Sequence, residues 1–73
     1  MKRGESMKPI YESKYLQLGL KIAYYRKLKG LTQEQLAESI DRTPAFIGHV
    51  EAPNISKAIS LDTLFDIAAA LDV

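Results

Sequence analysis

Hydrophobic residues recur along this chain at the three- and four-residue spacing of amphipathic helices, and no segment shows the strict alternation of a strand. In the first long segment the recurring apolar residues are Tyr15, Leu18, Ile22 and Tyr25. Ser13 precedes them and is a favourable N-cap, whereas Gly30 follows them and suits the left-handed position after a helix. The segment between Ser13 and Gly30 is therefore predicted to be a helix with one buried face.

A second helix is predicted from a capping box. Thr32 and Gln35 stand three residues apart, so the hydroxyl and the amide can each satisfy a free backbone N–H group at the helix start. The helix is expected to run over residues 33–40. Its predicted buried residues are Leu36, Ala37 and Ile40.

A third helix is predicted to begin almost at once. Thr43 is a good N-cap, and Pro44 is favoured at the first helical position, where its missing N–H costs nothing. This helix is expected to extend to about Glu51. Only residues 41–43 separate it from the second helix, and two short helices at this spacing are typical of a helix-turn-helix.

The last part of the chain is predicted to hold a loop and a fourth helix. Residues 52–59 are predicted to form the loop, which contains Lys57. Ser60 is the candidate N-cap of the helix that follows. The apolar positions of that helix are Leu61, Leu64, Ile67, Ala68 and Leu71.

Length and composition agree with one small all-α domain. A chain of 73 residues supports one compact core, and 47% apolar with 26% charged residues is close to the average for globular proteins. Residues 1–12 lack periodicity and are predicted to be a flexible arm. We therefore expect residues 13–73 to fold as a compact bundle of four helices.

Several classes of function are disfavoured by what the sequence lacks. No apolar run is long enough to span a membrane and no signal peptide is recognisable, so a cytoplasmic location is expected. With no cysteine and one histidine, neither a metal site nor a cofactor is expected. Ser39, His49 and Asp66 could nominally form a catalytic triad, but no nucleophile elbow or phosphate loop accompanies them. An enzyme is therefore not expected.

Charge is divided unevenly along the chain. Residues 1–30 carry eight basic and two acidic groups, which gives +6, whereas the remainder carries two basic and seven acidic groups, which gives −5. A basic surface attracts phosphate, but a charged helix face can also serve solubility alone. Charge by itself therefore leaves nucleic-acid binding open.

Two runs of residues resemble the Cro/C1-type (XRE-like) helix-turn-helix family. They are GLTQEQLA at residues 30–37 and TPAFIGHVE at residues 43–51, and the similarity covers residues 17–73. The resemblance implies a lambda-repressor-like bundle of four or five helices whose third helix enters the major groove of double-stranded DNA. It thereby implies sequence-specific DNA binding by a transcription regulator, usually repressor-like and dimeric on a two-fold operator.

The resemblance also implies roles for individual residues. Gln33 matches a position that contacts phosphate, and Thr43 is both a cap and a phosphate candidate. The positions from which the family reads bases are Pro44, Ala45, Gly48 and His49. Of these, only His49 has a side chain that can hydrogen-bond a base edge. Phe46 is expected either to pack on sugar-phosphate or to cover the core.

A structural pair and several departures complete the comparison with the family pattern. Arg26 and Glu51 match two residues that form a buried salt bridge in family members. Asp41 replaces the usual turn glycine, which is tolerable because aspartate adopts the left-handed region more readily than most residues. Arg42 stands where an apolar residue is common and is expected to extend outward toward phosphate. Lys57 lies in a loop that is longer than usual, and it is a further DNA-contact candidate.

A protein-interaction module remains the alternative. Leu16, Leu20 and Tyr24 form an apolar stripe beside the core face of the first helix, where they could bind a partner, extend the core or pack against the arm. A fifth helix, which often carries dimer contacts in this family, has no counterpart in the sequence. The resemblance therefore does not decide whether the chain forms a homodimer.

Overall fold

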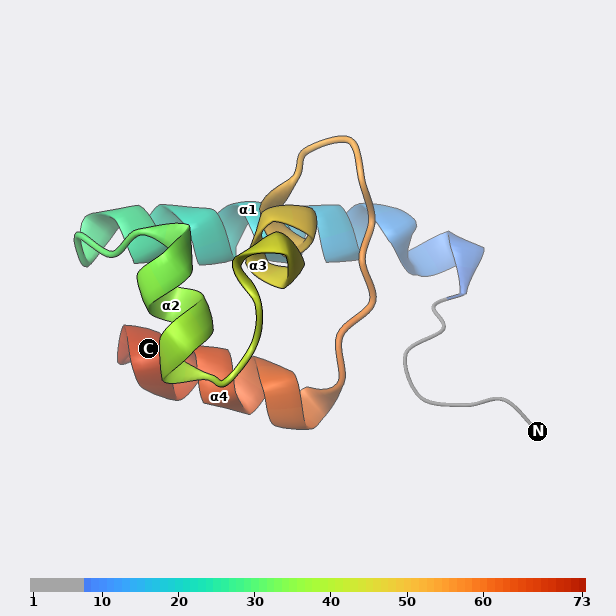
Figure 1. Cartoon of the computed structure of the whole chain (residues 1–73). Coiled ribbons are helices and arrows are strands. Elements are labelled where there is room, and N and C mark those ends of the chain that lie inside the picture. Colours follow the sequence, from blue (N-terminus) through green and yellow to red (C-terminus); the bar gives the residue numbers. More distant parts are fainter. Residues whose placement is uncertain (1–7) are drawn as a thin grey trace.

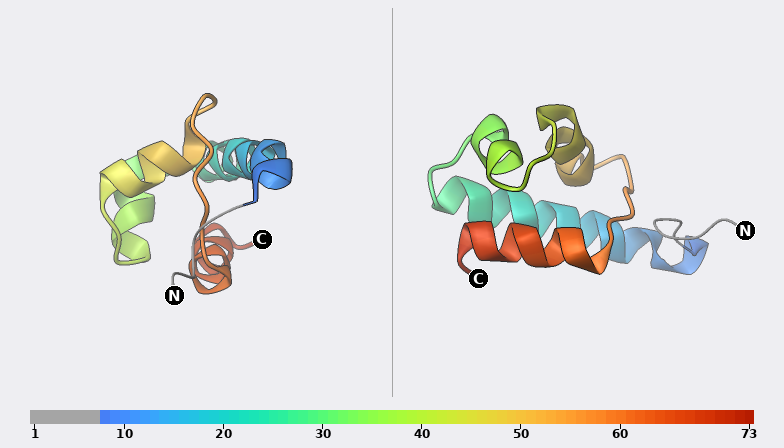
Figure 2. Two further views of the ribbon diagram at one scale, coloured as in Figure 1. Left: turned by 90° about the vertical axis from the view of Figure 1, so that its right-hand side faces the viewer. Right: turned by 60° about the horizontal axis from the view of Figure 1, so that its bottom comes forward.

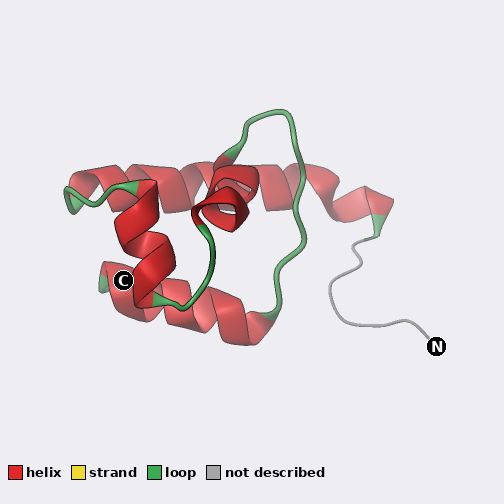
Figure 3. Cartoon of the chain, in the orientation of Figure 1, coloured by secondary structure: helices red, strands yellow, loops and turns green. Residues whose placement is uncertain are grey.

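A computed structural model of the chain describes residues 8–73. These residues contain helices and loops and no strand (Figure 3). The elements in chain order are the short 3-10 helix η1 (Pro9–Tyr11) and the α-helices α1 (Glu12–Leu28), α2 (Gln33–Ser39), α3 (Pro44–Glu51) and α4 (Leu61–Leu71). The predicted all-α class is confirmed.

The helices form two layers. α1 and α4 lie side by side and run in the same direction, and α2 and α3 pack together on one side of them (Figures 1 and 2). The segment between α3 and α4 crosses from one layer to the other (Figure 1). Within residues 8–73, no helix is both long and apolar enough to cross a membrane.

The core lies between these layers. Leu36 of α2, Ile47 of α3 and Ile67 of α4 are the largest fully buried side chains, one from each of three helices. α1 contributes Ile22 to the same cluster, and the loop before α4 contributes Ile59. Each short helix thus buries one side against the others, which positions the opposite side of α3 toward solvent.

Three of the helices begin where capping residues stand. The hydroxyls of Thr32, Thr43 and Ser60 each accept a hydrogen bond from the backbone N–H three residues later. The capping box of α2 is complete, because the Gln35 side chain also accepts from the Thr32 N–H at 2.8 Å. The start of α1 differs from the prediction.

Ser13 is not the N-cap of α1. The helix begins at Glu12, immediately after η1, so Ser13 already lies in its first turn. Tyr11 occupies the cap position without a side-chain cap hydrogen bond. Pro9 begins the helical turn of η1, so the chain becomes helical about one turn earlier than Ser13 as an N-cap would predict. The predicted arm, residues 1–12, falls partly on residues 1–7, which lie outside the described part, and its boundary stays a prediction.

A residue with left-handed backbone follows each of α1, α2 and α4. Gly30, Asp41 and Asp72 have φ values of 77°, 59° and 62° after α1, α2 and α4. The residue after Gly30 and the residue after Asp41 each donate a backbone hydrogen bond to the preceding helix. Leu31 N–H donates to the Arg26 carbonyl, and Arg42 N–H donates to the Ala37 carbonyl. This is the Schellman arrangement, and the expected left-handed conformation of Asp41 is confirmed.

The buried face of α1 differs in part from the predicted one. Tyr25 is 37% exposed, whereas Gly19 and Arg26 are buried. In α4 likewise, Leu61 is 67% exposed and Thr63 is buried in its place. The spacing of the apolar residues predicted the helices correctly. Because α3 packs against α1, however, the buried face of α1 includes Gly19 and not Tyr25.

Gly19 allows α1 and α3 to cross closely. A Cβ atom added at Gly19 would lie only 1.9 Å from the Val50 carbonyl oxygen at the end of α3. No side chain fits in that space, so the contact is between two backbones. The mid-helix glycine, which weakens a helix by roughly 0.5–1 kcal/mol relative to alanine, was the sequence signal for this approach, and it was missed.

Candidate nucleic-acid interface

The outer face of α3 is exposed to solvent and carries few polar side chains. Ile47 and Val50 are buried on its inner side, whereas Pro44, Ala45 and His49 are exposed on the outer side. Thr43 precedes them, and its Oγ1 accepts from the Phe46 N–H at 3.1 Å. The Thr43 hydroxyl proton remains free to donate to a ligand, because capping uses only a lone pair.

Three predicted DNA-contact residues converge at the first turn of α3. The Arg42 Cζ atom lies 4.4 Å from the centroid of the Phe46 ring, and the Lys57 Nζ atom lies 5.7 Å from it. Arg42 Nη2 also donates to Thr63 Oγ1 of α4 at 2.9 Å. Arg42 is exposed, as expected, but its side chain is held by these two contacts and does not extend freely.

Thr63 takes part in a larger connection that sequence reasoning missed. Its Oγ1 accepts from both Arg42 and Ser60 Oγ, while its backbone N–H donates to Ser60 Oγ at 3.2 Å. The N-cap of α4 is therefore joined directly to the turn between α2 and α3. A threonine in the first turn of a helix gave no signal of this role in the sequence.

Behind the exposed face, Arg26 and Glu51 form a buried ion pair. Arg26 Nε donates to Glu51 Oε2 at 2.7 Å and Nη2 donates to Oε1 at 2.9 Å, and each residue is 7% exposed. The hydrogen bond to Glu51 and its negative charge raise the pKa of the Arg26 guanidinium, against the opposing effect of burial. The two residues that the resemblance pairs thus tie α1 to the end of α3.

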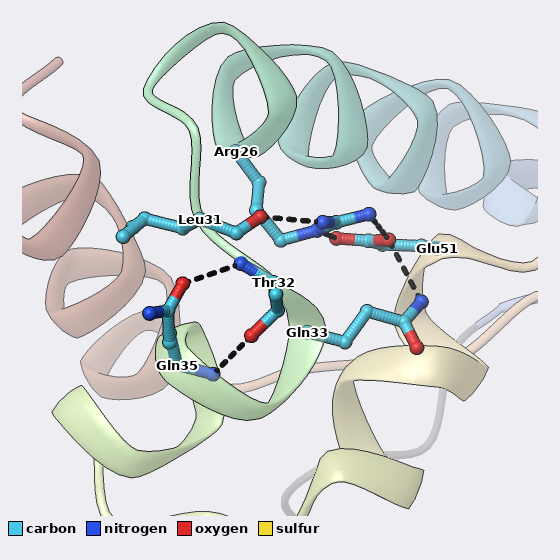
Figure 4. A network of polar contacts seen from close by, with 6 residues as sticks. All are labelled: Arg26, Leu31, Thr32, Gln33, Gln35 and Glu51. Carbon is cyan, nitrogen blue, oxygen red and sulfur yellow. Dashed lines mark hydrogen bonds and ion pairs between the residues drawn. The ribbon is translucent and has the colours of Figure 1, made fainter.

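The start of α2 is attached to this pair (Figure 4). Arg26 Nη1 donates to the Leu31 carbonyl at 2.7 Å, and Gln33 Nε2 donates to Glu51 Oε1 at 3.0 Å. Gln33 is half-buried, so part of its amide serves the fold. Its Oε1 forms no hydrogen bond within residues 8–73 and remains able to accept one. Phosphate oxygens accept hydrogen bonds, and one hydrogen of Gln33 Nε2 is already donated to Glu51. The predicted phosphate contact of Gln33 therefore has to use the second hydrogen of Nε2.

The apolar stripe on α1 is largely uncovered. Leu16 is half-buried, whereas Leu20 and Tyr24 are 49% and 59% exposed. Of the three alternatives that the sequence left open, an extension of the core is therefore wrong for Leu20 and Tyr24. Separately, small hollows lie between α1 and α4, and a lysine is among the residues that line each of them. The lysines are Lys14, Lys21 and Lys29.

Comparisons with known proteins agree with this geometry. The structure of the restriction-modification controller protein C.AhdI from Aeromonas hydrophila is similar, with a TM-score of 0.78 and 28% sequence identity over 86% of this chain and 88% of that chain. No curated protein has a significantly similar sequence. The model of the family described as helix-turn-helix matches residues 22–73, which is more than half of the sequence. The chain therefore belongs to the Cro/C1-type helix-turn-helix family of DNA-binding domains.

Proposed function

We propose that this chain is a repressor-like transcription regulator that binds double-stranded DNA sequence-specifically, with α3 in the major groove. The observation that carries the proposal is the arrangement around α3. Its outer face is exposed at Pro44, Ala45 and His49, and its first turn is flanked by Arg42 and Lys57, neither of which forms an ion pair within residues 8–73. A helix of this diameter fits the major groove, and flanking cations meet the phosphates on either side.

The readout of bases is expected to be modest. His49 offers one hydrogen-bonding side chain, Pro44 and Ala45 offer apolar contact to a thymine methyl, and Gly48 offers no side chain. Affinity should therefore come mainly from phosphate contacts and DNA shape. The phosphate contacts would come from Gln33, Arg42, Thr43 and Lys57, with Phe46 beside them.

Homodimerisation would compensate for this sparse readout. Two copies on a two-fold operator double the number of base contacts, with half-sites about one helical turn apart. Independently of the dimer, the likeness to a restriction-modification controller favours a role as a regulator.

Selection of bound sequences from a random duplex library, at a stated salt concentration, tests the proposal. A recovered consensus with two-fold symmetry would support both specific binding and the dimer, and a consensus without symmetry would support binding by one copy. Equal affinity for the selected duplex and a scrambled duplex would refute sequence-specific function.

A protein-interaction module is the second candidate, because Leu20 and Tyr24 leave an uncovered apolar surface on α1. An interaction-only protein would bind DNA no better than its charge predicts. Replacing Leu20 and Tyr24 with serine separates the two functions. The substitutions should leave operator affinity unchanged if α3 is the DNA-binding surface.

A further inference from the structure

We propose that Phe46 is a positioning residue that holds Arg42 and Lys57 as a two-cation clamp for phosphates of the DNA backbone. The inference rests on the proposed DNA-binding function and deepens it. In this arrangement the ring itself reads no base. It orients two charges that come from different parts of the chain, the turn before α3 and the loop after it.

Within the described residues, the two cations lie near one another and neither forms an ion pair. From their distances to the shared ring, their charges are no more than about 10 Å apart, which is roughly one Debye length at 0.1 M salt. Within residues 8–73, the one ion pair joins Arg26 and Glu51, so neither Arg42 nor Lys57 is paired with a carboxylate. Two like charges at this separation repel, and a phosphate between or beside them would relieve the repulsion.

The ring is fixed well enough to orient both cations. Phe46 is half-buried and packs against the hydrophobic core, so its position is set by the fold. The quadrupole of the ring attracts a cation over its face, and this attraction offsets part of the repulsion between the two charges. A leucine at position 46 could fill the same apolar site but would provide no such attraction.

Arg42 has a second anchor that leaves most of its donors free. One of its five N–H groups donates to Thr63 Oγ1. The remaining N–H groups can face an anion, and the guanidinium geometry suits phosphate oxygens. Lys57 is half-buried and adds a point charge from the α3–α4 loop. Together they would bind phosphate at the first turn of the helix that is proposed to enter the groove.

The salt dependence of DNA binding tests the clamp, because the slope of log affinity against log salt counts the phosphates neutralised. The variants are Phe46→Leu, Phe46→Tyr, and Arg42→Gln with Lys57→Gln, each measured on the selected duplex and a scrambled duplex. Lys21→Gln is the matched control, since Lys21 lines a hollow between α1 and α4 that no residue of α2 or α3 lines.

Phe46→Leu should lower the slope on both duplexes by about one to two, although it removes no charge. The advantage of the unmodified chain over this variant should then shrink roughly 4- to 16-fold between 50 and 200 mM salt. Phe46→Tyr, which keeps the ring, and Lys21→Gln should retain the original slope. Phe46→Leu should cause no further change in slope in the Arg42→Gln/Lys57→Gln background.

An unchanged slope in Phe46→Leu, with or without a loss of affinity, would overturn the clamp, since Phe46 would then be an apolar contact or a core residue. If that variant does not remain folded by circular dichroism, Phe46→Met takes its place with the same expected outcome. Binding without preference for the selected duplex would overturn sequence-specific function but leave the slope as the test of the clamp. Absence of any DNA binding by the unmodified chain would overturn both.

Discussion

At the scale of single residues, two buried charges organise the proposed DNA-binding surface. Arg26 donates to both carboxylate oxygens of Glu51 and to the Leu31 carbonyl, and Gln33 also donates to Glu51. Each charge would be costly alone in this poorly solvated position, and each is compensated by the other. The network therefore fixes the start of α2 relative to the end of α3.

Replacement of either Arg26 or Glu51 alone should strongly destabilise the fold. Arg26→Met or Glu51→Leu alone should lower the free energy of unfolding by about 3–5 kcal/mol, because each leaves an unpaired buried charge. The double replacement should cost less than the sum of the two. Urea unfolding of the three variants measures this coupling, and additive losses below about 1 kcal/mol would contradict it.

The same pair should be insensitive to alkaline pH. A guanidinium whose pKa is raised in the folded state contributes its stability fully below the unfolded-state pKa, and that contribution is lost only as pH rises through the folded value. The stability difference between the unmodified chain and the Arg26→Met/Glu51→Leu double variant, which leaves no lone buried carboxylate, should thus be constant from neutral pH to about pH 10, well below the ordinary arginine pKa. Urea titrations at several pH values check this.

His49 is expected to discriminate at one base position in each half-site. His49→Ala should reduce preference there by about 1–3 kcal/mol, because it removes the single hydrogen-bonding side chain among the base-facing positions. Lys57→Ala should instead weaken binding to the operator and to a scrambled duplex nearly equally. Titration of both duplexes separates the two roles. Equal weakening by His49→Ala would show that His49 does not read a base.

At the scale of elements, the contacts between short helices depend on glycine and on left-handed helix ends. α1 approaches the end of α3 at Gly19 with no room for a side chain, and the left-handed residue Asp41 turns the chain after α2 so that α3 can begin three residues later. Neither α2 nor α3 is long enough to be stable by itself, since isolated helices shorter than about 12 residues are marginal in water. Their packing therefore determines whether they form.

Gly19→Ala should destabilise the fold by about 1–3 kcal/mol, because its Cβ would overlap the Val50 carbonyl and force the helices apart. Gly48→Ala is the matched control in a second helix. A Cβ at Gly48 would meet only Gln33 Oε1 at 3.8 Å, so the gain in helix propensity should stabilise by about 0.5–1 kcal/mol. Thermal unfolding of both variants decides, and stabilisation by Gly19→Ala would contradict the close crossing.

Asp41→Gly should stabilise the protein by about 0.5–1 kcal/mol, since glycine adopts the left-handed conformation without the cost carried by an L side chain. Asp41→Val should destabilise it, because a β-branched residue is strained at a φ of 59°. Denaturant unfolding midpoints give the order of the three proteins. Valine as stable as aspartate would show that the turn has rearranged.

At the scale of the whole molecule, five cations of the part that the structure describes lie on two distinct surfaces. Arg42 and Lys57 flank the first turn of α3, whereas Lys14, Lys21 and Lys29 line hollows between α1 and α4. The net charge of +1 conceals this distribution. Of these two surfaces, the first lies beside the proposed DNA-reading face, so the charge on Lys14, Lys21 and Lys29 is not expected to add to phosphate binding there.

A dimer would make half-site spacing critical. Insertion of five base pairs between the selected half-sites turns one of them to the opposite side of the duplex. Affinity should then fall on the order of 100-fold, because the second copy loses its effective concentration. Anisotropy titrations with both duplexes, combined with sedimentation of the complex, measure affinity and stoichiometry. Unchanged affinity with one bound copy would indicate that the chain acts as a monomer.

The sequence by itself determined the helix-turn-helix and the starts of α2, α3 and α4, because the caps at Thr32, Thr43 and Ser60 act over three residues. Resemblance to the family identified Arg26 and Glu51 as partners. Only the tertiary structure decided the features that join distant segments. These are the crossing at Gly19, the exposure of Tyr25 and Leu61, the attachment of Gln33 to Glu51, and the convergence of Arg42, Phe46, Lys57 and Thr63. Such contacts depend on how packed helices rotate against one another, which a local pattern of residues does not encode.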